Sequence, residues 1–441
     1  MNGLERIREA ARQDKELRFN NLLHHITPAL LREAFFALKR DAAPGVDKVT
    51  WGQYNVKLEG NLSSLHERIH KGTYRATPSK RIWIPKPDGR QRPIGIAILE
   101  DKIVQQAVVW ILNQIYEVDF VGFSYGFRPG RSQHNALDAL WVGITERKVN
   151  WILDADISSF FDTVDHEKLM EFLQHRITDQ RVLRLIRKWL RAGISEEGQI
   201  SKTSLGTPQG AVVSPILANI YLHYALDLWV QNWRKNRAKG DVIMVRYADD
   251  FVVGFQHKSE AERFLQELVE QLAGYGLELH RDKTRLIEFG RFAAIDRAKR
   301  GEGKPETFDF LGFTHICAKT RRGNRFTIRR KTMAKRLRMR IQKVVGELMQ
   351  RKHDPVPEQG KWLRSVIGGH VNYYAVPGNK QAIDAYRTEA IRGWLRALRG
   401  RSQKARRLTW ERFNRIVNRW IPRARIVHPY PSQRLHVNHP K

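Results

Sequence analysis

The sequence predicts an α+β fold in which a central part containing strands is followed by an all-helical C-terminal part. The chain has 441 residues and is 41% hydrophobic, enough for two to four domains with substantial cores. β-Branched and aromatic runs with turn signals between them occur in the central part, residues 76–318. Apolar residues recur at helical spacing before and after it. A domain boundary is therefore expected near residue 320.

The N-terminal extension, residues 1–75, is predicted to be helical and to lead into a β-hairpin. Thr27 and Pro28 are helix-start signals. The apolar residues that follow them at helical spacing are Leu30, Leu31, Ala34, Phe35 and Leu38. From Arg81, the run RIWIPKPDGRQRPIGI indicates two strands around a Pro-Asp-Gly turn. Residues 98–118 then return to a helical pattern.

Three later segments carry strand patterns. WILDADISSFFDTVD, residues 151–165, begins as a buried strand and continues as a helix. VIMVRYADDFVVGF, residues 242–255, has two apolar β-branched runs around a polar tip, which predicts a hairpin whose turn presents Asp249 and Asp250. FDFLGFTHI, residues 308–316, is a third strand candidate.

Positive charge is concentrated toward the C-terminus. The formal net charge is +32, and residues 319–441 contain 32 Lys and Arg against 6 Asp and Glu. A predicted helix in this region has one apolar stripe, formed by Met333, Leu337, Ile341, Val344, Val345 and Leu348. Its basic side chains remain free for phosphates and are Arg336, Arg338, Arg340 and Lys343. Nucleic acid is therefore the expected partner; a basic surface that serves only solubility is the alternative.

The composition excludes several classes of protein. One cysteine, Cys317, permits neither a disulfide framework nor a cysteine-based zinc site, and a reducing compartment is expected. No apolar run approaches the roughly 18 residues that a transmembrane helix needs. The charged start, MNGLERIREAARQDKELRF, does not match a signal peptide. We therefore expect a soluble intracellular protein.

Acidic residues at the ends of two predicted strands indicate a metal site. Asp249 and Asp250 stand side by side at the tip of an apolar hairpin, where like charges repel unless a cation is bound; a solvated turn is the alternative. Asp156 ends a buried strand and can face them across neighbouring strands. Three such carboxylates can hold two Mg²⁺ ions about 3.5–4 Å apart, which serves phosphoryl transfer on a nucleotide. Asp154 lies on the same strand face but deeper, so we rank it second.

Six sequence blocks occur in the order and spacing typical of reverse transcriptases. They are GFRPGRSQHNAL, DADISSFFD, GTPQGAVVSPILANIYL, YADD, GLELHRDKTRL and FDFLGF. Together with the N-terminal extension and the basic C-terminal part, they make the chain resemble group II intron-encoded proteins, in the form that lacks an HNH endonuclease domain. GGHVNYYAVPGN, residues 368–379, is similar to a signature of the maturase domain in that family.

The resemblance implies a right-hand polymerase followed by a helical domain. Fingers and a palm with an antiparallel sheet would occupy residues 76–318, after an N-terminal extension and the start of the fingers in residues 1–75. A helical thumb, called the maturase or X domain, would occupy residues 319–425. Residues 426–441 would form a basic tail.

The resemblance also implies roles for individual residues. Asp156, Asp249 and Asp250 would be the catalytic ligands of two Mg²⁺ ions. The residues that would bind the incoming deoxynucleoside triphosphate are Lys86, Arg92, Phe161, Gln209, Gly210 and Lys283. Those that would grip the primer end are Phe310, Leu311, Gly312 and Phe313. In this scheme Phe161 packs beneath the deoxyribose and excludes a 2′-hydroxyl. Without the resemblance, Lys86 and Arg92 would be ordinary charges on a hairpin and Phe161 a core aromatic. Gln209 and Gly210 would be part of a loop, and residues 310–313 a buried strand.

The resemblance implies an RNA-directed DNA polymerase that also binds its parent group II intron RNA, as a ribonucleoprotein that promotes splicing and mobility. Further partners would be dNTPs and a DNA target and primer, without a membrane, in the bacterial cytoplasm and at the nucleoid. Without an endonuclease, the protein would need a borrowed primer for target-primed reverse transcription. Two alternatives stay open: a free-standing reverse transcriptase in DNA repair or phage defence, and a catalytically silent splicing factor that binds RNA.

Overall fold

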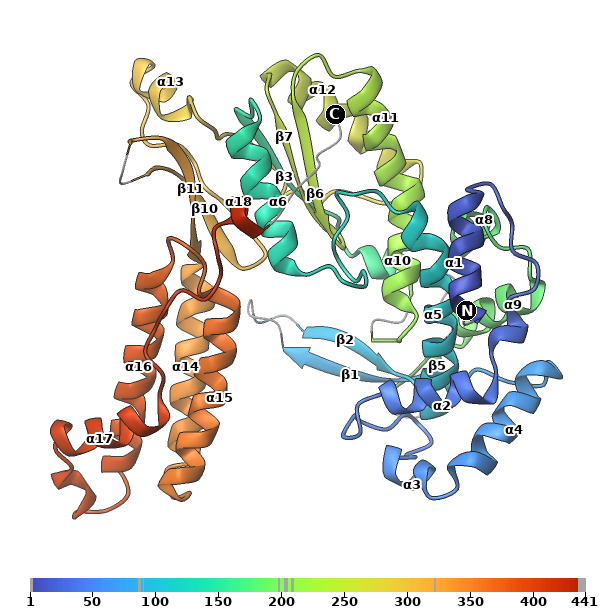
Figure 1. Ribbon diagram of the computed structural model, residues 1–441, viewed down its shortest axis with the longest axis horizontal. Helices are drawn as coiled ribbons and strands as arrows, with labels where there is room; N and C mark the ends of the chain where they lie inside the picture. The colour runs from blue at the N-terminus through green and yellow to red at the C-terminus, as the bar shows by residue number, and fades with distance from the viewer. Residues whose placement is uncertain are drawn as a thin grey trace.

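The computed structural model describes residues 3–85, 89, 91–196, 199–201, 205–207, 210–320 and 323–434. The N-terminal helices (blue) and the C-terminal helices (orange to red) lie on opposite sides of the molecule (Figure 1). A hairpin of β1 (Ser79–Pro85) and β2 (Gln91–Ile96) extends between them. The predicted α+β fold class is confirmed. None of the described helices is long and apolar enough to cross a membrane.

The N-terminal region is helical, as predicted. Its elements are α1 (Gly3–Gln13), η1 (Leu23–His25), α2 (Pro28–Ala37), α3 (Trp51–Asn55) and α4 (Leu58–His70). The Thr27 side chain caps α2 by accepting a hydrogen bond from the backbone N–H of Leu30 at 3.1 Å. Antiparallel pairing of β1 with β2 confirms the predicted hairpin. Its sheet has the order β2-β1-β4-β5, completed by β4 (Ile194–Glu196) and β5 (Gln199–Ser201).

The central sheet has the order β6-β7-β3-β8, and each neighbouring pair is antiparallel. Its strands are β3 (Trp151–Asp156), β6 (Val242–Tyr247), β7 (Asp250–Phe255) and β8 (Arg285–Glu288). The hairpin predicted over residues 242–255 is confirmed, with Ala248 and Asp249 between its strands. Beyond β3 the chain enters the short helix α7 (Phe160–Thr163), again as predicted.

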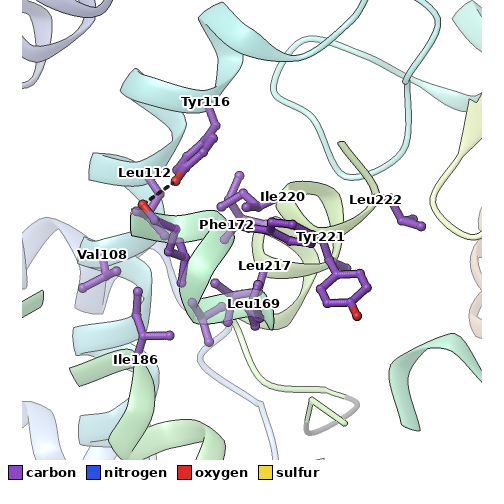
Figure 2. Packing of buried hydrophobic residues seen from close by; sticks show 14 of the residues in the cluster. Val108, Leu112, Tyr116, Leu169, Phe172, Ile186, Leu217, Ile220, Tyr221 and Leu222 are labelled. Carbon is purple, nitrogen blue, oxygen red and sulfur yellow. Dashed lines mark hydrogen bonds between the residues drawn. The ribbon is translucent and has the colours of Figure 1, made fainter. Parts of the chain in front are cut away.

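The main hydrophobic core includes residues of most of the helices around the central sheet. They are α5 (Leu99–Asp119), α6 (Gln133–Glu146), α8 (His166–Gln174), α9 (Gln180–Arg191), α10 (Ser214–Leu222), the π-helix η2 (His223–Asp227), α11 (Leu228–Asn236), α12 (Lys258–Ala273) and α13 (Ala293–Lys299). Figure 2 shows apolar side chains of α5, α8, α9 and α10 packed together, Leu112, Leu169, Ile186 and Leu217 among them. At the edge of this group, the Tyr116 hydroxyl donates a hydrogen bond to the Leu173 carbonyl at 3.2 Å.

A second antiparallel sheet, in the order β11-β10-β9, connects the central part to the C-terminal helices. Its strands are β9 (Phe308–Phe310), β10 (Phe313–Lys319) and β11 (Phe326–Thr332). The helices are α14 (Ala334–Gln350), α15 (Val356–Tyr374), α16 (Lys380–Arg399), η3 (Ala405–Arg407), α17 (Trp410–Trp420) and α18 (Pro431–Arg434). The expected boundary between residues 318 and 319 thus falls within the β10–β11 hairpin, and the helices begin only at Ala334.

Residues 308–316 form two strands where the sequence pattern predicts one. Leu311 and Gly312 have φ angles of 46° and 84°, so the chain reverses and Phe310 pairs with Phe313. A leucine rarely adopts a positive φ, and the apolar run FLGF carries none of the usual turn residues apart from its glycine. The local sequence pattern therefore could not indicate that the chain reverses here.

A buried ion cluster closes the C-terminal segment onto the central part. Asp138 on α6 is fully buried and accepts hydrogen bonds from Arg330 on β11 at 2.9 Å and from Arg434 on α18 at 2.5 Å. Helix α18 consequently lies beside α6, although the two are far apart in the sequence (Figure 1). One carboxylate therefore neutralises two arginines, of which Arg330 is buried and Arg434 is half-buried.

Replacing Asp138 by alanine should destabilise the protein strongly. The substitution leaves the buried Arg330 guanidinium unpaired, and breaking a buried ion pair from one side costs about 3–5 kcal/mol. Urea unfolding followed by tryptophan fluorescence measures the loss. The control is Asp384→Ala, because Asp384 forms an exposed ion pair with Lys380 at 3.7 Å, a kind worth roughly 0–1 kcal/mol. Equal shifts of the two variants would contradict a structural role for the cluster.

Candidate active site

Three aspartates meet where the two inner strands of the central sheet, β3 and β7, end and begin. Asp156 is the last residue of β3, Asp250 is the first residue of β7, and the two are paired directly across the strands. Asp249 occupies the turn before β7, and its carbonyl accepts a hydrogen bond from the N–H of Ile157 at 3.3 Å. Asp154 lies two residues deeper on β3. The structure therefore brings together the carboxylates that the sequence placed at the ends of separate strands.

The carboxylates share a half-buried and electrostatically unfavourable position. Burial raises the pKa of Asp250 well above its usual range, and the charges of Asp154 and Asp156 raise it further. Burial also raises the pKa of Asp249, and repulsion from Asp156 adds to the effect. The pKa of Asp154 rises to about 6 through burial, against the attraction of Arg285 at 3.7 Å. All three shifts favour protonation, which a bound cation would oppose.

Lys283 supplies positive charge next to the aspartates. Its ammonium group forms an ion pair with the Asp156 carboxylate. Among the residues that the structure describes, no three His, Cys, Asp or Glu side chains stand grouped as a ready metal site. The set still fits Mg²⁺ chemically, because carboxylate oxygens are the ligands that this ion prefers. Burial first, and then repulsion from neighbouring aspartates, raises the pKa values of Asp249 and Asp250, and a bound cation would offset both effects.

An arginine buried behind the turn holds it in place. Arg246 on β6 and Asp227 at the end of η2 are both fully buried and form a two-pronged ion pair, with Nε–Oδ1 and Nη2–Oδ2 distances of 2.7 and 2.5 Å. The same guanidinium donates to the Ala248 carbonyl at 2.9 Å and to the Ser124 hydroxyl at 2.8 Å. Ala248 has a φ of 58°, so this bond fixes a strained residue directly before Asp249.

Sequence reasoning did not identify this support. The available signal was Arg246 itself, a charged residue inside the otherwise apolar strand VIMVRY. Its partner could not be found from pattern, because Asp227 faces the core from a π-helical turn, a rare conformation that often accompanies functional sites. Gly126 also belongs to the support: a Cβ there would lie 2.3 Å from the Ala248 nitrogen.

A cavity of about 310 Å³ lies between the β1–β2 sheet and α7. Phe161, Ile94 and Thr207 contribute to its lining. Phe161 is half-buried, and Phe160 beside it is buried in the core. The Thr207 hydroxyl is buried and has no hydrogen-bond partner within the described ranges. This cavity has the size of a small-ligand site.

The other residues predicted for nucleotide binding are only partly described. Gly210 has a φ of 107°, and a Cβ there would lie 2.7 Å from Ile94 Cγ2, so only glycine fits this close approach. Arg92 is exposed on β2, and its charge lowers the pKa of Asp249, which places it toward the carboxylates. Lys86 and Gln209 lie outside the described residues.

The predicted primer grip is a tight turn seated on the C-terminal helices. Phe310 and Phe313 are buried in the core, so only Leu311 and Gly312 are presented at the turn. The Tyr373 hydroxyl on α15 donates to the Leu311 carbonyl at 2.8 Å. A Cβ on Gly312 would lie 2.9 Å from the Arg336 guanidinium and 3.0 Å from the Tyr374 hydroxyl.

Helix α14 presents the predicted basic surface. Its stripe is buried at Val344 and Leu348 and half-buried elsewhere. The four residues predicted to bind RNA, Arg336, Arg338, Arg340 and Lys343, are all exposed. The Arg340 guanidinium lies 4.9 Å from the centre of the Tyr374 ring, a cation–π distance. Arg336 and Arg340 thus lie next to Tyr373 and Tyr374, which contact the Leu311–Gly312 turn.

An antiparallel sheet with carboxylates at the edge of two neighbouring strands, followed by a helical domain, is the architecture of a right-hand polymerase. Residues 84–315 match the family described as reverse transcriptase (RNA-dependent DNA polymerase), and the chain belongs to this family.

Named relatives connect the chain with intron-encoded proteins. It is 36% identical over 310 residues to Protein YkfC of Escherichia coli (strain K12), an alignment that covers 63% of this chain and 81% of that protein. It is 40% identical over 173 residues to the group II intron-encoded protein LtrA of Lactococcus lactis subsp. cremoris, an alignment that covers 39% of this chain and 28% of LtrA. A 91 kDa protein in a cob intron of Schizosaccharomyces pombe is 44% identical over 171 residues, an alignment that covers 39% of this chain and 21% of that protein. The match to LtrA and to the yeast protein thus spans less than a third of either.

Replacing Asp227 by asparagine should slow primer extension by about 100-fold, because the turn before Asp249 would lose its anchor and a displacement near 1 Å costs about that factor. Extension is measured per folded molecule on an RNA template. The control is Asp119→Asn, which removes the partner of the buried Arg176 at 3.3 Å, an ion pair that includes neither Arg246 nor the turn residues. An equal loss of rate in both variants would reduce the effect to general destabilisation.

Proposed function

We infer that this chain is an RNA-directed DNA polymerase whose catalytic carboxylates are Asp156, Asp249 and Asp250. The observation that carries the proposal is the convergence of these half-buried side chains where β3 ends and β7 begins, with raised pKa values at Asp249 and Asp250. Membership of the reverse transcriptase family supports it. Two Mg²⁺ ions bound there would supply activation of the primer 3′-hydroxyl and stabilisation of the leaving pyrophosphate.

The remaining predicted residues would position the substrates. Arg92, with Lys86 and Lys283, would hold the triphosphate, since the charges of Arg92 and Lys283 both reach Asp249. Phe161 would pack under the sugar and exclude a 2′-hydroxyl from the 310 Å³ cavity. Gln209 and Gly210 would lie against the new base pair, and the Leu311–Gly312 turn, with Phe310 and Phe313 as its buried base, would hold the primer end.

We also infer that the basic C-terminal third binds a group II intron RNA. Support comes from the charge excess of residues 319–441, from the exposed cations of α14, and from relatives named as intron-encoded. In this proposal, residues 76–318 are fingers and palm, residues 319–425 the thumb or maturase domain, and residues 426–441 a basic tail. The protein would hold the RNA's fold for splicing and take part in intron mobility by target-primed reverse transcription in the bacterial cytoplasm.

An Asp249→Asn variant separates the two activities. A neutral amide is a poor Mg²⁺ ligand, so primer extension should fall by at least about 100-fold. RNA affinity should stay within a few-fold, and RNA that co-purifies from the native cell should still be enriched in one intron, including its excised lariat. The control is Asp296→Asn on α13, an exposed aspartate that pairs with Lys299 at 4.0 Å.

Two outcomes would contradict this assignment. Retained synthesis by the Asp249→Asn variant would remove the catalytic role of the turn. Enrichment of unrelated RNAs, or of a short dedicated noncoding RNA, would leave the polymerase in place but move its biology to DNA repair or phage defence.

A Phe161→Val variant should incorporate ribonucleotides more readily. Removing the ring opens space where a 2′-hydroxyl would otherwise clash, so the preference for dNTPs over rNTPs should fall by at least about tenfold. The ratio of kcat/KM for the two substrates is measured on one RNA template, which makes the result independent of the folded fraction. An unchanged ratio would return Phe161 to a role in packing.

A further inference from the structure

A cleft of about 730 Å³ lies outside the candidate active site and shares no lining residue with it. One wall is the β10–β11 hairpin, another is the connection from α15 to α16, and the third is the C-terminal segment before α18. Sites for small ligands have volumes of roughly 300–1,000 Å³, so one or two nucleotides fit this space.

The walls of the cleft carry an excess of positive charge. Lys319, Arg329 and Lys380 line it together with a single carboxylate that faces solvent, Asp384, which pairs with Lys380 at 3.7 Å. Lys319 and Arg329 are exposed, and neither has an acidic partner within 4.0 Å in the part of the chain that the structure describes. Arg330, also in the lining, is buried and already neutralised by Asp138. Two cations therefore remain available for an anion.

An exposed aromatic ring stands at the mouth of the cleft. Tyr430 lines the cleft and is 58% exposed. Its carbonyl accepts hydrogen bonds from the N–H groups of Gln433 at 2.9 Å and Arg434 at 3.2 Å, and Arg434 is tied to the buried Asp138. The ring is thus presented to solvent from a fixed backbone, as a stacking platform requires.

We propose that this cleft binds unpaired nucleotides of a single-stranded nucleic acid, with a base stacked on Tyr430 and phosphates on Lys319 and Arg329. A cationic wall beside an exposed ring matches the chemistry of single-strand binding, where stacking and phosphate contacts act together. The inference extends the proposed function, because both a folded intron RNA and a displaced DNA strand offer such nucleotides. The cleft would give the polymerase a second hold on nucleic acid, separate from the primer and template.

The test measures binding at the cleft while the polymerase site is occupied. The full-length protein is first saturated with an RNA–DNA primer–template duplex. Fluorescein-labelled octamers, one of uridine ribonucleotides and one of thymidine deoxynucleotides, are then titrated and followed by fluorescence anisotropy. Tyr430→Ala should weaken octamer binding by about 5- to 150-fold, the usual range for loss of one stacking contact. Tyr430→Trp should restore it, and the tighter-binding octamer identifies RNA or DNA as the natural source.

Matched charge variants test the phosphate contacts. Lys319→Ala with Arg329→Ala should make the dependence of log affinity on log salt shallower by about 1.4, or roughly 0.7 for each phosphate on a single strand. Lys404→Ala with Arg406→Ala is the control, since both are exposed cations outside the cleft, and its slope should not change. Unweakened binding by Tyr430→Ala, or equal slopes in the two double variants, would overturn the proposal.

Primer extension on the same samples keeps the two proposals apart. The Tyr430→Ala variant should extend primers at the unchanged rate, which also shows that it is folded. If the unmodified protein extends no primer but its octamer binding depends on Tyr430, the polymerase proposal fails and the cleft proposal stands. If the protein extends primers normally but its octamer binding does not depend on Tyr430, the cleft proposal fails and the polymerase proposal stands.

Discussion

The buried ion pair between Arg246 and Asp227 is the interaction on which the candidate active site depends. Each charge is tolerated in the core only because the other is present in a two-pronged geometry. Through this pair the π-helix fixes a guanidinium whose remaining N–H groups hold the Ala248 carbonyl and the Ser124 hydroxyl. An apolar residue at position 246 could fill the same strand, but it could not tie a helix, a loop and a turn to one point.

The aspartates that Arg246 and Asp227 help to position destabilise the folded state when they are ionised. Burial and mutual repulsion both favour the protonated forms of Asp249 and Asp250. Lys283 offsets part of the repulsion by pairing with Asp156, and Arg285 does the same for Asp154. Groups kept in such an unfavourable state are characteristic of functional sites, because a ligand of opposite charge relieves the strain when it binds.

The C-terminal helices are mechanically joined to the polymerase part at the Leu311–Gly312 turn. Tyr373 binds the turn's carbonyl and Tyr374 lies against its glycine, so a movement of α15 must move the turn. The reversal there was invisible to the sequence pattern, because its positive φ angles are held by contacts with a helix some 60 residues later. Arg340, stacked on Tyr374, links this region to the basic surface of α14.

Local sequence patterns specify the two strands that carry the acidic residues, but not the chain reversal at Leu311 and Gly312. Two β-branched runs around Asp249 and Asp250 specify a hairpin with an acidic tip, and the pattern before Asp156 specifies a buried strand that ends there. What supports and surrounds these groups depends on contacts between segments that are distant in the sequence. Asp138 and Arg434 are 296 residues apart, yet they form one ion pair. Hydrophobic periodicity records which face of an element is buried, but it contains no information about which buried charge meets which partner.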